Sequence, residues 1–298
     1  MRVYSPSATT SFMECPMWWS LAGEWEPRQV NGPRDLARIL GRGFTAGMAS
    51  YHQWRQIEHP ILTVEAPSAV VESAIAAAIL ATTQGKNELG ERFLNERDDA
   101  TRNALESRVT KAVKKAIQLD PIPPEWERVM VEADLGEAYG HAKPDLVVDS
   151  PRGLTPVDYK LKLAVRGRSP EERDRNLEYL IQEYEFSWQM YHYCWALADF
   201  TGAKVTQYYI ALVTLEPSFK IQLLPYEIDP ESMDLWHVMA TRTWEDMEQV
   251  DEGHVLPSCP MYHATRYGVC DCQRAVWKHH LDPALMEQDY VRRKRSGR

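Results

Sequence analysis

The sequence predicts an α/β fold in which a helical N-terminal part precedes a sheet-forming centre. Apolar residues recur at helical spacing through residues 34–58, 68–82 and 101–118, and the breaker run Pro121-Ile-Pro-Pro124 follows them. Short apolar runs of the β type come after this breaker, and several of them alternate with period two. The chain has 298 residues, of which 44% are hydrophobic and 26% charged, so it can bury a substantial core.

The helical part is expected to cover residues 1–120. Ser5-Pro6 is typical of an N-cap followed by proline at the first helical position, and the helix it opens would carry Phe12, Cys15 and Trp19 along one face. The alanine-rich segment 68–82 is expected to be a buried helix. Three glycines are expected to break the helix at 34–58: Gly41, Gly43 and Gly47.

The helix at 101–118 is clearly amphipathic. Its apolar stripe consists of Leu105, Val109, Ala112, Val113, Ala116 and Ile117. The basic residues Arg108, Lys111, Lys114 and Lys115 fall mostly off that stripe. Solvation is the ordinary explanation of such a basic face, and contact with DNA is the alternative.

The sheet core is expected at residues 121–228, with strands at 129–132, 146–148, 154–161, 204–215 and 219–228. The charged segment 166–185 reads as a surface loop that leads into a helix. A further helix at 229–250 opens a C-terminal part, 229–290, that contains a cysteine cluster, and a basic tail covers 291–298. We expect residues 1–298 to form a single domain.

Two carboxylates and one ammonium stand at the strand ends of a predicted hairpin. Asp145 opens the strand at 146–148, and the turn Asp149-Ser-Pro-Arg-Gly153 leads back toward Asp158. Lys160 follows Asp158 by two residues, so both side chains point to one face of an extended strand. Two carboxylates at about 4 Å repel by about 4 kcal/mol near a protein surface, and a divalent cation removes that penalty. The pattern predicts a metal-dependent phosphodiesterase site, although an Asp-x-Lys triplet alone is more often a solvated strand edge.

Two flanking elements carry side chains suited to such a site. Gln189 and Tyr193 are one helical turn apart on one face, where they could orient Lys160 or contact a phosphate. An amphipathic core helix explains the same pair without any function. Upstream, Glu132 ends a strand just before Asp145 and offers one more carboxylate, either for a second metal or for the surroundings of the first.

The charge balance neither requires nor excludes a nucleic-acid partner. The net charge is −9, and phosphate binding normally uses a basic surface. Basic residues nevertheless gather near the predicted site, at Lys160, Lys162, Arg166 and Arg168, so a local basic groove in an acidic protein is feasible. The sequence shows neither a long apolar run nor the pattern of a signal peptide, so we expect a cytoplasmic protein without a membrane partner.

With these motifs in order, the chain resembles the PD-(D/E)XK nuclease superfamily, in particular its RecB-like branch with CRISPR-associated adaptation nucleases and phage exonucleases. The matching stretches are Ser5-Pro-Ser-Ala-Thr-Thr-Ser-Phe-Met-Glu-Cys15-Pro16, Gly140-His-Ala-Lys-Pro-Asp145, Val157-Asp158-Tyr159-Lys160 and Gln189-x-x-x-Tyr193. The resemblance implies a restriction-endonuclease-like core, with a central mixed β-sheet flanked by helices. It also implies a Mg²⁺- or Mn²⁺-dependent DNA exonuclease.

Roles for individual residues follow from the same resemblance. Asp145 and Asp158 would bind the metal, with the backbone carbonyl of Tyr159 as a further ligand; for the remaining position, either Glu132 and water fill it or the metal binds more weakly. Lys160 would position or help activate the attacking water, and Gln189 and Tyr193 would support Lys160 and the DNA backbone. The DNA-binding set is expected to be Lys111, Lys114, Lys115, Lys162, Arg166 and Arg168.

One stretch departs from the family pattern. Many relatives carry Gly-x-x-x-His on an N-terminal helix, with the histidine as a metal ligand, whereas Gly43-Phe-Thr-Ala-Gly47 ends in glycine. His52 lies five residues further along, on the wrong helical face for a substitute. We therefore expect the metal to be one protein ligand short.

The cysteines suggest a second inorganic centre. Cys194 reads as a buried small residue, while Cys15 near the start and Cys259, Cys270 and Cys272 near the end match the split arrangement of iron–sulfur members of the resembled family. The expected group is a [4Fe–4S] cluster. A zinc site that uses His254 or His263 and free thiols are the alternatives, because the spacing Cys259-x10-Cys270-x-Cys272 departs from the family's pattern.

The leading functional hypothesis is a metal-dependent exonuclease in recombination, repair or phage DNA processing, and a recombination or replication protein is the partner expected to deliver it to DNA. A nuclease fold that binds DNA or a partner without cutting is the second hypothesis, favoured by the missing histidine and opposed by the intact Asp-Asp-Lys set. A sequence-specific endonuclease of the same superfamily is the third.

Overall fold

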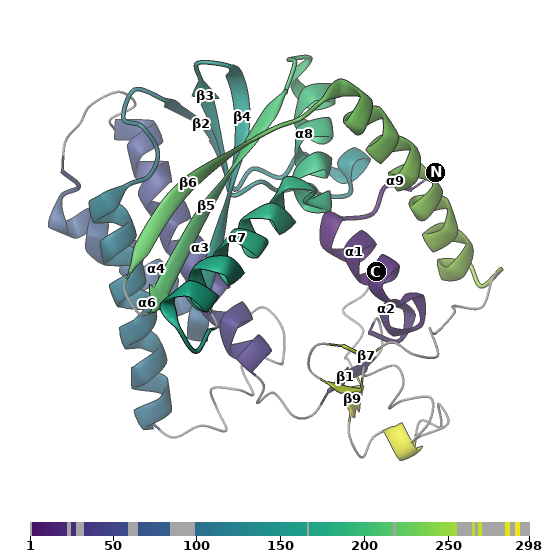
Figure 1. The fold of residues 1–298 in the computed structure, drawn as a ribbon, viewed down its shortest axis with the longest axis horizontal. Coiled ribbons are helices and arrows are strands. Elements are labelled where there is room, and N and C mark those ends of the chain that lie inside the picture. The colour runs from purple at the N-terminus through teal and green to yellow at the C-terminus, as the bar shows by residue number, and fades with distance from the viewer. Residues whose placement is uncertain are drawn as a thin grey trace. The chain divides into compact units, whose positions relative to one another are not determined.

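The computed structural model describes residues 2–22, 25–27, 33–58, 65–83, 99–165, 167–216, 219–254, 264–265, 268–269, 284–286 and 290–292. The chain forms two compact units (Figure 1). The larger unit comprises residues 31–135 and 142–233, and the smaller comprises 1–30, 136–141 and 234–298. Each unit is described by itself below. The expected single domain over 1–298 stays a prediction.

A five-stranded mixed sheet is the centre of the larger unit. Its strands are β2 (Glu127–Val131), β3 (Leu146–Ser150), β4 (Gly153–Ala164), β5 (Gln207–Glu216) and β6 (Lys220–Glu227), in the spatial order of their numbering. β4 and β5 are parallel, and the other neighbours are antiparallel. The predicted strands are confirmed, and with them the α/β class.

The β3–β4 hairpin turns where the sequence predicted. Gly153 adopts a φ of +92°, which residues other than glycine rarely reach. The Ser150 hydroxyl donates to the Gly153 carbonyl at 3.1 Å and accepts from the Arg152 N–H at 3.2 Å. This turn sets the register of the hairpin, which pairs Leu146 with Val157.

The parallel pair β4–β5 needs a crossover connection. Two helices supply it, α7 (Pro170–Glu185) and α8 (Trp188–Thr201). Ser169 caps α7 and Ser187 caps α8, each through its side-chain oxygen. The hydroxyl of Tyr208 on β5 donates to the carbonyls of Tyr184 and Glu185 at 2.6 and 2.9 Å, which ties the end of α7 to the sheet.

A layer of three helices completes the larger unit: α3 (Pro33–Glu58), α4 (Ser68–Thr83) and α6 (Asp99–Leu119). The predicted breaks in the first of them are wrong, because α3 is continuous. Its glycines instead permit close packing. A Cβ at Gly47 would lie 2.8 Å from Val113 Cγ2 and 3.0 Å from the Ala74 carbonyl oxygen, so α3 approaches α4 and α6 more closely than any side chain would allow.

The burial of α6 agrees with the prediction from its sequence, whereas the burial of α4 does not. The predicted apolar stripe of α6 is buried throughout, and Arg108, Lys111, Lys114 and Lys115 are exposed, which fits both solvation and contact with DNA. α4 is less buried than its composition suggested. Ala74, Ala78 and Thr82 form its buried face, while Leu80 is 52% exposed.

The smaller unit contains the short helices α1 (Pro6–Glu14), α2 (Pro16–Ala22) and η1 (Glu137–Tyr139), and α9 (Pro230–Asp251) from Asp234 onward. Its short strands are β1 (Trp25–Pro27), β7 (Ala264–Thr265), β8 (Gly268–Val269) and β9 (Tyr290–Arg292). The expectation of one helix through Cys15 and Trp19 is wrong. Cys15 is extended at φ −160°, because Pro16 disfavours the helical region for the residue before it and starts α2.

Contacts between distant parts of the sequence hold the smaller unit together. β1 pairs with β9 in antiparallel fashion, so segments from the two ends of the chain meet. The indole N–H of Trp244 on α9 donates to the buried Thr9 hydroxyl of α1 at 3.1 Å. Among the described residues, no helix is both long and apolar enough to cross a membrane.

Candidate active site

The candidate site lies where β4 loses one of its two neighbours. β3 pairs with β4 only as far as Leu146 opposite Val157, whereas β5 continues alongside β4 to Glu216 opposite Ala164. The stretch from Asp158 onward therefore has a strand on one side only. An edge of this kind leaves backbone N–H and C=O groups to be satisfied by something other than a sheet partner.

A side chain satisfies the first of these groups. Asp145, the residue just before β3, accepts a hydrogen bond from the Tyr159 N–H through Oδ2 at 2.8 Å. The Asp145 carbonyl in turn accepts from the Glu132 N–H at 3.1 Å, at the end of β2. The end of the β2–β3 ladder thus fixes the Asp145 carboxylate against the open edge of β4.

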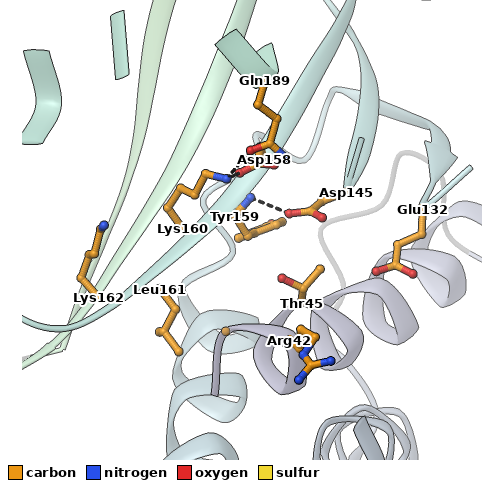
Figure 2. A pocket seen from close by; sticks show the side chains of 11 residues that line it. Arg42, Thr45, Glu132, Asp145, Asp158, Tyr159, Lys160, Leu161, Lys162 and Gln189 are labelled. Carbon is orange, nitrogen blue, oxygen red and sulfur yellow. Dashed lines mark hydrogen bonds and ion pairs between the residues drawn. The ribbon is translucent and has the colours of Figure 1, made fainter. Parts of the chain in front are cut away.

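Alternate residues of β4 carry the charged side chains of the site. Lys160 Nζ lies 2.6 Å from Asp158 Oδ2, so the two form an ion pair on one face of the strand, as their spacing predicted. Lys160 also donates to Gln189 Oε1 at 2.8 Å, and Gln189 Nε2 donates to the Tyr193 hydroxyl at 2.8 Å. The ion pair and these contacts hold the ammonium between β4 and α8 (Figure 2).

The opposite face of β4 holds the site in place from within the core. The Tyr159 hydroxyl lies 2.7 Å from His52 Nε2, and the Tyr159 ring meets Phe44 edge-on at 5.9 Å between centroids. His52 is 1% exposed, and burial lowers its pKa to about 4, so the imidazole is neutral near pH 7. His52 is therefore a core residue that positions Tyr159, and it belongs to the other face from the charged set.

The electrostatics of the site follow from burial and proximity. Burial, together with the charge of Asp158, raises the pKa of Asp145 well above its ordinary value. Burial alone would lower the pKa of Lys160, but the charge and hydrogen bond of Asp158 outweigh it and raise this pKa. Lys160 is therefore an ammonium at neutral pH, suited to stabilising negative charge and unsuited to accepting a proton.

These groups open into a pocket of about 550 Å³. Its lining consists of Gly41, Arg42, Thr45, Glu132, Asp145, Asp158, Tyr159, Lys160, Leu161, Lys162 and Gln189. Figure 2 shows Thr45 and Arg42 on α3 facing the space beside the charged set, with Glu132 on one side and Lys162 farther along β4 on the other. The pocket thus joins an acidic part to a basic part.

The lining corrects the expectation about Gly47. Gly47 lies where α3 packs against α4 and α6, so a side chain at this position would not face the pocket. The α3 positions that do line the pocket are Gly41, Arg42 and Thr45. Position 47 is therefore not where a metal ligand is missing, and that expectation was wrong. The spacing of glycines alone does not show which face of a helix packs against its neighbours.

Glu132 lies at the rim of the pocket. Its backbone has a φ of +45°, which is uncommon outside glycine, and its carboxylate forms an ion pair with Lys143 at 2.7 Å. It raises the pKa of Asp145 less than burial and Asp158 do. The structure thus brings Glu132 to the pocket, with its carboxylate already engaged by an ammonium.

The structure describes five of the six expected DNA-binding residues. Lys111, Lys114 and Lys115 are exposed on α6, and Arg168 is exposed beyond the end of β4. Lys162 alone of this set lines the pocket, and Arg166 falls outside the described residues. Sequence reasoning missed Arg42 and Thr45, whose only signal was the glycine-rich helix around them.

The donor set for a metal is incomplete but of the right kind. Asp145 and Asp158 converge, and their mutual repulsion would be relieved by a divalent cation with a preference for oxygen ligands. Within the described ranges, no group of three or more His, Cys, Asp or Glu side chains is placed to hold a metal ion. A cation held here would have Asp145 and Asp158 as its side-chain ligands, and backbone carbonyls or water would have to supply the remaining positions.

Most of the cysteine cluster lies outside the described residues. Cys15 is buried at the end of α1, and Cys194 is buried in α8, as predicted. Cys259, Cys270, Cys272 and His263 lie outside the described residues, and His254 is exposed. The iron–sulfur, zinc and thiol alternatives all stay predictions.

Comparison with known proteins identifies the family to which this mixed sheet and its Asp-Asp-Lys set belong. A sequence model of the PD-(D/E)XK nuclease superfamily matches residues 3–274. The chain belongs to this superfamily, and the expected restriction-endonuclease-like fold is confirmed. A search of curated protein sequences finds no match.

Among solved structures, the chain is similar to a protein from Eubacterium rectale whose crystal structure is named "Putative exonuclease". The two chains are 15% identical, with a TM-score of 0.49, over 92% of this chain and 87% of the other.

Proposed function

We propose that the protein is a Mg²⁺- or Mn²⁺-dependent DNA exonuclease that hydrolyses phosphodiester bonds in the pocket beside β4. The observation that carries the proposal is the hydrogen bond from the Tyr159 N–H to Asp145 Oδ2 at 2.8 Å. It places one carboxylate at the open strand edge next to Asp158 and Lys160. Superfamily membership supports phosphodiester hydrolysis, and DNA is the substrate expected of such a nuclease.

Asp145 and Asp158 would hold the metal, together with the Tyr159 carbonyl, while Glu132 at the rim would act through water. A bound divalent cation supplies Lewis-acid polarisation of the scissile phosphate and a more acidic water. Lys160 stays protonated, so it would position the attacking water or stabilise charge on the phosphate. Gln189 and Tyr193 fix the direction of its ammonium through the chain of 2.8 Å hydrogen bonds.

Degradation from DNA ends, in recombination, repair or phage DNA processing, is the biological setting that we propose. A recombination or replication protein would deliver DNA to this acidic chain, whose net charge is −9. The resemblance of the sequence motifs to RecB-like exonucleases supports this part of the proposal.

A binding module without cleavage is the second candidate. It is favoured by the donor set, in which no third carboxylate, imidazole or thiolate of the described residues joins Asp145 and Asp158. A weak metal site of this kind should respond to the ion, because Mn²⁺ binds nitrogen and oxygen ligands more tightly than Mg²⁺ does. Cleavage with Mn²⁺ alone would indicate a weak site, and DNA binding without cleavage in either ion would favour the module.

A [4Fe–4S] cluster in the smaller unit is a separate proposal, with Cys15, Cys259, Cys270 and Cys272 as ligands. The antiparallel pair β1–β9 supports it, because that pairing brings segments from both ends of the chain into one unit. Protein purified without oxygen should be brown with absorbance near 400 nm and should contain iron and sulfide. Zinc in their place would favour the alternative site.

The decisive assay uses linear DNA labelled at either its 5′ or its 3′ end and, in parallel, a closed circular duplex. The expected result is stepwise release of nucleotides from linear DNA, dependent on Mg²⁺ or Mn²⁺ and abolished by a chelator. Cleavage of the closed circle would instead indicate an endonuclease. No cleavage of any DNA in either metal would contradict the proposed function.

A further inference from the structure

The basic part of the pocket carries a lysine that the Asp-Asp-Lys set does not use. Lys162 follows Lys160 by two residues on β4, so its side chain leaves the same face of the strand about 6.6 Å farther along. Lys162 also lines the pocket. Its Nζ lies 5.8 Å from the centre of the Tyr184 ring, within reach of a cation–π interaction.

Tyr184 is held rigidly beneath this ammonium. It lies near the end of α7, where its carbonyl accepts from the Tyr208 hydroxyl at 2.6 Å and from the Ser187 N–H at 3.1 Å. The residue is 8% exposed. Because two neighbours fix its backbone, the ring is a preformed support for the Lys162 head group.

The Tyr184 hydroxyl is unsatisfied. It is buried, and it has no hydrogen-bond partner among the described residues. Tyr184 is not among the residues that line the pocket, so it acts on a bound ligand through Lys162 and not by direct contact. Burial and the nearby charge of Asp158 raise the pKa of Tyr184, so the group remains a donor at neutral pH.

We propose that Lys162 and Tyr184 form a subsite for the phosphate next to the scissile one. This inference rests on the proposed function, because it assumes that the scissile phosphate lies at Asp145, Asp158 and Lys160. The offset along β4 is comparable with one nucleotide of an extended strand. A single strand would then run along the open edge of β4, with its scissile phosphate at the acidic end and the next phosphate at Lys162.

The residues have distinct parts in this subsite. Lys162 supplies the charge that binds the phosphate. Tyr184 does not contact the nucleotide and positions that charge through its ring. Arg42 on α3 lines the same pocket, so the strand would pass between a wall from α3 and the edge of β4.

The test uses single-stranded oligonucleotides in which one linkage at a time is an uncharged methylphosphonate. We expect kcat/KM of the unmodified protein to fall about tenfold when the linkage next to the scissile one loses its charge. Lys162→Ala should cost about tenfold on the normal oligonucleotide and nothing further on that modified one. Tyr184→Phe keeps the ring and should match the unmodified protein, whereas Tyr184→Ala removes the ring and should lose about threefold, with the same insensitivity to the modification.

Lys204→Ala is the matched control, because Lys204 is an exposed lysine of the same unit outside the pocket. It should leave all these values unchanged. Additive losses from Lys162→Ala and the uncharged linkage would overturn the subsite, and so would equal behaviour of Lys162→Ala and Lys204→Ala. A Tyr184→Ala protein identical to the unmodified one would remove Tyr184 from the subsite.

Dissociation constants of the same oligonucleotides, measured with Ca²⁺, separate this inference from the proposed function. If no DNA is cleaved but Lys162→Ala and the modified linkage remain coupled in binding, the subsite stands while the exonuclease proposal fails. If DNA is cleaved without any coupling, the subsite alone is contradicted. The salt dependence should agree, with a slope of log Kd that is smaller by about 0.7 in Lys162→Ala for a single strand.

Discussion

The two halves of β4 differ in what pairs with them, and the difference locates the chemistry. Residues 153–157 have β3 on one side, and this half is continuous with the buried core, with Thr155 and Val157 fully buried. Residues 158–164 pair only with β5, and they carry Asp158, Lys160 and Lys162. The charged side chains thus occur where the ladder on one side has ended.

Asp145 connects the two halves. In a complete sheet the Tyr159 N–H would bond to a backbone carbonyl of β3, but here a carboxylate takes that place. One hydrogen bond therefore continues the ladder and also delivers an acidic group to the pocket. Substitutions in the open half should therefore change mainly the activity, and substitutions in the paired half mainly the stability.

The largest expected effect is on the open half. Lys160→Ala removes the ammonium between Asp158 and Gln189, so kcat for DNA cleavage should fall by about 10³-fold. The protein should remain folded, but its melting temperature should fall, because the buried Asp158 loses its ion-pair partner. Undiminished cleavage by the Lys160→Ala protein would contradict its role.

Acid should destabilise the fold through His52, which contacts Tyr159 in the core. The pKa of His52 is about 4 in the folded chain, below its ordinary 6.5, because burial disfavours the charged form. Its contribution is therefore fully present above pH 6.5 and is lost as pH falls toward 4, by about 3 kcal/mol at most. Urea unfolding between pH 7.5 and 4.5 should show this slope, and His52→Gln should flatten it. Equal slopes in both proteins would contradict the assignment.

The paired half should respond in stability alone. Val148→Ala removes buried methyl groups opposite Thr155, and the free energy of unfolding should fall by about 2 kcal/mol. Below its melting temperature, this protein should keep kcat within about twofold of the unmodified one. A large loss of kcat with an unchanged fold would show that the two halves are not separable in this way.

The smallest effect separates the two roles of Asp145. Asp145→Asn keeps an oxygen acceptor for the Tyr159 N–H and removes the repulsion with Asp158, so the metal-free protein should be at least as stable as the unmodified one. Asp145→Ala should be less stable than Asp145→Asn by about 1 kcal/mol, because the N–H loses its partner. Metal-free urea unfolding measures the difference, and both proteins should lose cleavage. Equal stabilities would mean that the side chain does not continue the ladder.

Much of this arrangement could be predicted from local patterns. Period-two alternation located β4 and β5, and the spacing of Asp158 and Lys160 placed both on one face. Helical spacing put Gln189 and Tyr193 together, and they do contact each other. These predictions depend on short-range geometry, which the sequence states directly.

The rest depended on long-range packing. The phase of α3 could not be predicted, because Gly43 and Gly47 gave no sign that they pack against α4 and α6 while Thr45 lines the pocket. The pairing of β3 with β4 ends at Leu146 opposite Val157, and no local sequence pattern indicates this end point. The Lys162–Tyr184 contact joins a strand to a crossover helix, so only the folded chain brings the two residues together.

One measurement tests the central claim most directly. Asp158→Asn and Asp149→Asn make the same chemical change, at the open edge of β4 and at an exposed position of β3. Metal-dependent release of nucleotides from end-labelled DNA should fall by about 10³-fold in Asp158→Asn and stay within about twofold in Asp149→Asn. Cleavage by Asp158→Asn at the rate of the unmodified protein would contradict the account.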